Sequence, residues 1–134
     1  LVELIIVIAI MAVLIGVLAP QYLKYVEKSR KSADLDTLDG MISAVEIFSA
    51  DPANSIVDGT LTCSADGEIS ADDAVLKALK DAGIAKSTAT AGDTLTSVKS
   101  TTYKHAWTIN FDENGVQVND NDPNSTLAAD LGRN

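Results

Sequence analysis

The sequence predicts an α+β fold, in which the apolar half of a long N-terminal helix protrudes and a small antiparallel sheet packs on its second half. Three observations support this: an apolar run at residues 1–19, helical spacing of apolar residues over 24–50, and strand signals separated by turn residues after 94. We therefore divide the chain into a membrane or core helix, 1–23, and an outer head, 24–134, that includes the amphipathic helix half.

The first nineteen residues are predicted to form a transmembrane helix. They read LVELIIVIAIMAVLIGVLA and contain thirteen Leu, Ile or Val. As a helix they reach about 28 Å, close to the roughly 30 Å hydrocarbon thickness of a bilayer. Thirteen such residues favour insertion by roughly 5 kcal/mol, against a cost of about 3 for a central carboxylate. A cleaved secretory signal is the rival, but its apolar core is usually shorter, roughly 7–15 residues.

Glu3 is the one acidic side chain within this run. A carboxylate in apolar surroundings is costly unless it finds a partner. One interpretation places Glu3 at the membrane interface, facing the headgroups. The other makes it a register device, because an opposite charge about 4 Å away supplies on the order of 4 kcal/mol at an effective dielectric near 20. Such a pair penalises every wrong stagger of packed helices.

Gly16 and Pro20 are predicted to weaken the apolar helix. The proline ring clashes with the carbonyl four residues earlier, which belongs to Gly16, and it removes one helical N–H donor. A lone membrane helix would therefore be kinked here. Backbone groups freed by such a break need neighbours or water as partners.

Residues 21–50 continue the helix with one apolar face, after an interruption around residues 29–32. The face is formed by Leu23, Val26, Leu35, Leu38, Ile42, Val45 and Phe48. A basic cluster lies in the first part of the same segment and is formed by Lys24, Lys28, Arg30 and Lys31. Three roles stay open for this cluster: a patch for anionic lipids, a solvated collar, or an inter-subunit partner for acidic heads.

Charge differs sharply between the two ends of the chain. Residues 1–31 hold four basic and two acidic groups, whereas residues 32–134 hold six basic and seventeen acidic ones, within a net charge of −9. An acidic head repels polyanions, so we expect it not to bind nucleic acid directly. The basic N-terminal part of one copy is therefore expected to attract the acidic head of another.

The head is predicted to begin with turns and a second helix. Asp51-Pro52 ends the long helix, and residues 52–69 are turn-rich with a possible strand around 56–62. Ser70 is expected to cap a helix that Gly83 stops.

Strand signals follow at about 95–104, 105–112 and 115–119, the last two joined by a tight turn at Asn114-Gly115. A sheet of three or four strands would bury an alternating subset of Leu95, Val98, Tyr103, Trp107, Ile109, Phe111, Val116 and Val118. The tail, 120–134, is polar and is expected to be weakly ordered.

The residues that could carry chemistry are sparse. Cys63 is the only cysteine, so an intrachain disulfide is impossible, and His105 is the only histidine. There is no phosphate-binding glycine loop and no CxxC motif, so we expect no enzymatic activity and no cofactor. Asp120 and Asp122 offer oxygen ligands for a weak calcium site, but Pro123 and the missing EF-hand spacing favour a solvated turn.

The string LVELIIVIAIMAVLIGVLAPQYLKYVEKSRKSA resembles the N-terminal signature of type IV pilins and the related pseudopilins. The match covers about thirty residues: an apolar run with one early Glu, then a proline, then a basic amphipathic stretch. The resemblance implies that a prepilin peptidase removes a short leader and that the new N-terminus is methylated. In the family the Glu is the fifth mature residue, so Glu3 implies that two residues and the leader are missing from this sequence.

The resemblance also implies specific roles for the residues singled out above. Glu3 would pair with the N-terminal amine of a neighbouring subunit. The segment from Ala12 to Pro20 would partly unwind in a filament.

The function expected from the resemblance is that of a major type IV pilus subunit. The chain would wait in the cytoplasmic membrane and be polymerised by an ATPase-driven machine into a homopolymeric cell-surface filament. Adhesion, motility or DNA uptake would then be properties of the fibre. Two alternatives remain: a pseudopilin of a secretion system, some of which hold calcium in a C-terminal loop, and a single-pass membrane-anchored binding domain.

Overall fold

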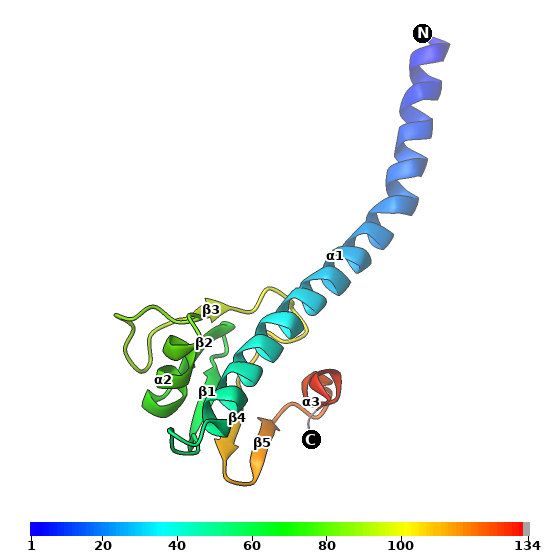
Figure 1. The fold of residues 1–134 in the computed structure, drawn as a ribbon. Coiled ribbons are helices and arrows are strands. Elements are labelled where there is room, and N and C mark those ends of the chain that lie inside the picture. The colour runs from blue at the N-terminus through cyan, green and yellow to red at the C-terminus, as the bar shows by residue number, and fades with distance from the viewer. Residues whose placement is uncertain (133–134) are drawn as a thin grey trace.

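The computed structural model describes residues 1–132 of the 134-residue chain. A single helix, α1 (Val2–Ala50), runs through the first 50 residues and extends far beyond the rest of the molecule (Figure 1). The head gathers around the second half of α1. This α+β arrangement, with an exposed apolar helix half and an antiparallel sheet against the other half, is a pilin-like architecture and confirms the predicted fold class.

The sheet has five strands in the order β3-β2-β1-β4-β5, and every neighbouring pair is antiparallel. The strands are β1 (Gly59–Cys63), β2 (Glu68–Ala71), β3 (Thr96–Ser97), β4 (Trp107–Asp112) and β5 (Gly115–Asp120). The sheet is thus larger than the three or four strands predicted. The additional strand, β2, lies partly within the segment that the sequence marked as turn-rich.

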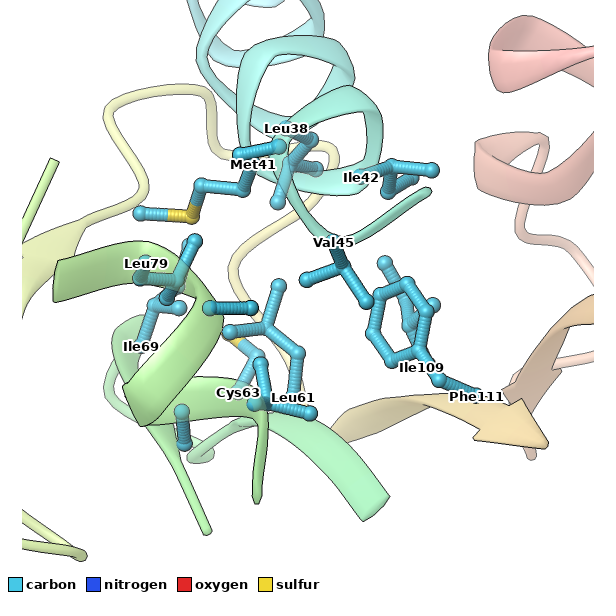
Figure 2. Packing of buried hydrophobic residues seen from close by; sticks show 14 of the residues in the cluster. Leu38, Met41, Ile42, Val45, Leu61, Cys63, Ile69, Leu79, Ile109 and Phe111 are labelled. Carbon is cyan, nitrogen blue, oxygen red and sulfur yellow. The ribbon is translucent and has the colours of Figure 1, made fainter. Parts of the chain in front are cut away.

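The core lies between α1, the helix α2 (Asp73–Asp81) and one face of the sheet (Figure 2). Leu38, Ile42 and Val45 of α1 are almost completely buried and recur at spacings of three and four residues. Strand β4 alternates between buried and half-buried residues, so that Trp107, Ile109 and Phe111 face the core. The apolar residues that recur at helical spacing in α1 and at alternate positions in β4 therefore pack together in one core.

The predicted cap of the second helix was wrong. Ser70 belongs to β2, where it lies opposite Thr62 of β1. The N-cap of α2 is Asp72, whose carboxylate accepts the backbone N–H groups of Val75 at 3.1 Å and of Thr60 at 2.8 Å. One side chain thus satisfies a helix N-terminus and ties it to β1, which favours Asp72 over the hydroxyl of Ser70.

The strand predicted at 95–104 is reduced to the two residues of β3. The next residues cannot continue a ladder, because the amides of Lys99 and Ser100 bond to a carboxylate of α1 instead. The following strand begins at Trp107 rather than at 105.

One further expectation is corrected. The tail is not uniformly irregular in its described part, because it contains α3 (Leu127–Leu131), whose end residues Leu127 and Leu131 are both buried; residues 133–134 of the predicted tail lie outside the described residues. The predicted continuation of the helix is confirmed, since α1 is helical through residues 29–32, where the apolar spacing is interrupted.

Candidate assembly surface

The N-terminal half of α1 presents an uncovered apolar surface. Every Leu, Ile, Val and Met between Leu1 and Leu18 is at least 51% exposed, whereas Leu38 further along the same helix is fully buried. Within the described residues, α1 is the one helix long and apolar enough to cross a membrane. Such a segment cannot remain in water, so it indicates membrane association or secretion.

Glu3 lies in the first turn of α1. Helical spacing places it on the same side as Ile6, Val7 and Ile10, so a partner that packs against those residues also meets the carboxylate. It is the only acidic or basic side chain of residues 1–23. Whatever packs against this end of the helix must therefore satisfy one negative charge.

The helix remains continuous through Gly16 and Pro20 in the single subunit. Its course does change direction between its dark blue N-terminal part and its cyan part (Figure 1). A Cβ added at Gly16 would meet no other side chain within 4 Å, so no contact inside the subunit requires glycine there. The unwinding expected between Ala12 and Pro20 is absent here and stays a prediction for the assembled state.

Two carboxylates of α1 hold the loop of residues 99–102 against the helix, and we call this contact the neck. Asp34, which is buried, accepts the backbone N–H of Ser100 at 2.7 Å and that of Lys99 at 3.0 Å. Glu27 accepts the Ser100 hydroxyl and, from Thr102, the backbone N–H at 3.2 Å and the hydroxyl at 3.0 Å. The neck fixes the head to the helix just beyond the apolar half.

The hydrogen bonds at the neck favour the ionised form of Glu27. The Ser100 hydroxyl, together with the Thr102 and Thr101 donors, lowers the pKa of Glu27 to about 2 against the opposing effect of burial. Its negative charge is thus retained at all physiological pH values. Sequence reasoning missed this role, because the donors that Glu27 and Asp34 meet lie far along the chain, in residues 99–102.

The predicted basic cluster does not act as one unit. Lys24, Lys28 and Arg30 are exposed, but Lys31 turns toward the head. Its ammonium lies 3.8 Å from the carboxylate of Asp130 and 5.6 Å from the ring centroid of Tyr103. Part of this cluster therefore stabilises the subunit itself.

Asp130 of α3 joins three segments of the head. It accepts the Tyr103 hydroxyl at 2.5 Å and the Thr126 hydroxyl at 2.7 Å, in addition to its contact with Lys31. The Tyr103 bond lowers the pKa of Asp130, whereas burial, followed by the Asp130 contact, raises the pKa of Tyr103. This cluster holds the C-terminal helix against α1, and sequence reasoning missed it because the tail was expected to be weakly ordered.

The weak calcium candidates are engaged in local contacts. Asp120 lies 2.8 Å from Nε2 of His105 and accepts the backbone N–H of Asp122 at 3.0 Å. Asp122 in turn accepts the N–H of Asn124 at 2.9 Å. Among the described residues, no group of three metal-ligating side chains comes together.

Comparisons with known proteins found no matching family model, no matching curated protein and no matching solved structure.

Proposed function

We propose that this chain is the structural subunit of a type IV pilus filament that polymerises through its N-terminal helix. One observation carries the proposal: a continuous helix exposes every large apolar side chain of its first half while a folded head covers its second half. Burying a Leu, Ile or Val side chain is worth about 1.5–3 kcal/mol, so residues 1–18 must be covered by lipid or by other helices. Lipid would cover these residues before assembly, and the helices of other copies would cover them in the filament.

Glu3 supports assembly over simple anchoring. An anchor gains nothing from a carboxylate in its apolar segment, whereas helices that must pack at one stagger gain specificity from it. We assign Glu3 to pair with the N-terminal amine of a neighbouring copy. Gly16 and Pro20 would then mark the segment of α1 that unwinds on packing.

The partners follow from this role. They are identical subunits, the cytoplasmic membrane before assembly, a prepilin peptidase that exposes the methylated N-terminus, and the assembly ATPase with its platform. The finished fibre would stand on the cell surface and serve adhesion, motility or DNA uptake. The chain would act without enzymatic activity or cofactor of its own.

Substitution of Glu3 tests the proposal. Cells producing Glu3→Ala should keep the subunit in the membrane but yield at least tenfold fewer filaments, as counted by electron microscopy of sheared material. Asp81→Ala, which removes an exposed acid from α2, is the matched control and should assemble normally. Normal filaments from Glu3→Ala would refute the role of Glu3. If the unchanged chain gave only short stubs or membrane-bound monomers, a pseudopilin or a membrane anchor would replace the filament assignment.

A further inference from the structure

An open groove of about 590 Å³ lies where α1 enters the head, and we call it the collar groove. It is lined by Leu23, Lys24, Glu27, Lys28, Lys31 and Thr102. Leu23 is 66% exposed, and neither Lys24 nor Lys28 has an ion-pair partner within 4 Å in the described part of the chain. Because the carboxylate of Glu27 accepts donors from the loop, the groove presents two unpaired ammonium groups beside an apolar side chain.

A second concavity, of about 400 Å³, lies at the opposite end of the head, and we call it the tip. It is lined by Ile56, Asp58, Asp112, Glu113 and Asn114. These residues come from the loop after α1 and from the β4-β5 hairpin, which is farthest from the N-terminus (Figure 1). Ile56 is 57% exposed, and Asp58 and Glu113 are both exposed.

We infer that the tip of one copy binds the collar groove of a second copy. The two surfaces match in kind, since each carries one exposed aliphatic side chain beside charges: the charges are acidic on the tip, and in the groove three lysines outnumber the single ionised carboxylate of Glu27. Ion pairs of this type select partner and register. The inference rests on the proposed function, because it names the contact between heads that the filament would use.

The approximate stagger between the paired copies follows if the end of α1 is taken as the level of the tip, because Ile56 and Asp58 follow that end closely in the chain. Lys28 and the end of α1 at Ala50 are separated by 22 residues of continuous helix. At 1.5 Å per residue this corresponds to an axial offset of about 33 Å between parallel copies. A contact between two different surfaces that advances along one axis does not close into a ring, so it propagates as a filament.

Charge exchange tests this contact. Lys24→Glu with Lys28→Glu should lower the yield of sheared filaments at least tenfold, and so should Asp58→Lys with Glu113→Lys. All four changes in one chain should restore the yield to within about threefold of the unchanged protein. Lys77→Glu, on the exposed side of α2, is the control and should assemble normally. Circular dichroism of each detergent-solubilised subunit verifies the fold.

The outcomes separate this contact from the filament itself. Normal assembly of the Lys24→Glu, Lys28→Glu chain, or a folded four-substitution chain that stays unassembled, would overturn the tip-to-collar contact while the proposed function stands. A drop in membrane-bound subunit that the acidic-to-basic changes do not rescue would assign the groove to anionic lipid instead. Absence of filaments from the unchanged chain would refute both the contact and the proposed function.

Discussion

The two halves of α1 differ in every respect except their backbone. The first half, residues 1–23, contains no buried side chain, whereas the second half buries seven residues between Asp34 and Phe48. Apolar residues surround the first half on all sides but form a single face on the second. A helix that is apolar all round needs an apolar environment outside the subunit, and an amphipathic one is satisfied by its own fold. One continuous helix thus packs in two different environments, outside the head in its first half and against the head in its second half.

The largest effect should come from a matched pair of leucines, one in each half. Leu38→Ala should lower the free energy of unfolding of the head by about 2–5 kcal/mol, because it removes a fully buried side chain from the core. Leu14→Ala, at a position 53% exposed, should change it by less than about 0.5 kcal/mol. Denaturant unfolding of the full chain in detergent measures both. Equal effects of the two substitutions would contradict the division of α1.

A smaller effect is expected at the neck, where the two halves meet. Asp34→Ala leaves the amides of Lys99 and Ser100 without their acceptor, and a buried unsatisfied group costs about 1–3 kcal/mol. The free energy of unfolding should fall by that amount, and the amide hydrogens of residues 99–100 should exchange faster with solvent. Thr37→Ala is the control, because its hydroxyl bonds only to Ala33 one turn earlier. Unchanged exchange at Ser100 would show that Asp34 does not hold the loop.

The smallest effect is a pH dependence confined to the head and neck. The pKa of Glu27 falls on folding from an ordinary 4.5 to about 2, and the pKa of Asp130 is also lowered. A lowered folded pKa means that the stabilisation is fully present above about pH 4.5 and is lost as the pH falls toward 2. Glu27→Gln, which does not titrate, should flatten the stability profile in that window. A profile identical to that of the unchanged chain would exclude Glu27 as a contributor.

Local sequence patterns predicted the regular elements well, because each carries a period that one segment reveals by itself. The end of α1 at Asp51, the core face through Leu38 and Val45, and the hairpin at Asn114-Gly115 all follow from such patterns. Asp72, by contrast, was missed as a cap because its second partner, Thr60, lies on a strand twelve residues earlier.

Local sequence patterns could not predict the polar contacts of the head either, because the residues that form them lie far apart in the chain. Glu27 and Asp34 meet donors more than sixty residues away, and Asp130 meets Lys31, which lies 99 residues earlier. No spacing within a short window encodes such pairs. The candidate assembly residues Glu3, Gly16 and Pro20 show the opposite limit, since their expected partners belong to other copies and one subunit leaves them exposed.

The burial of Cys63 has a practical consequence for labelling the protein. The thiol is 1% exposed, and burial raises its pKa to about 11, so the chain's only native sulfhydryl is poorly reactive. A cysteine introduced on the head, for example at the exposed Ser87, would therefore be the single readily labelled site per subunit. Maleimide dyes would then report the location of the protein on living cells, and any filament it forms, without removal of any native residue.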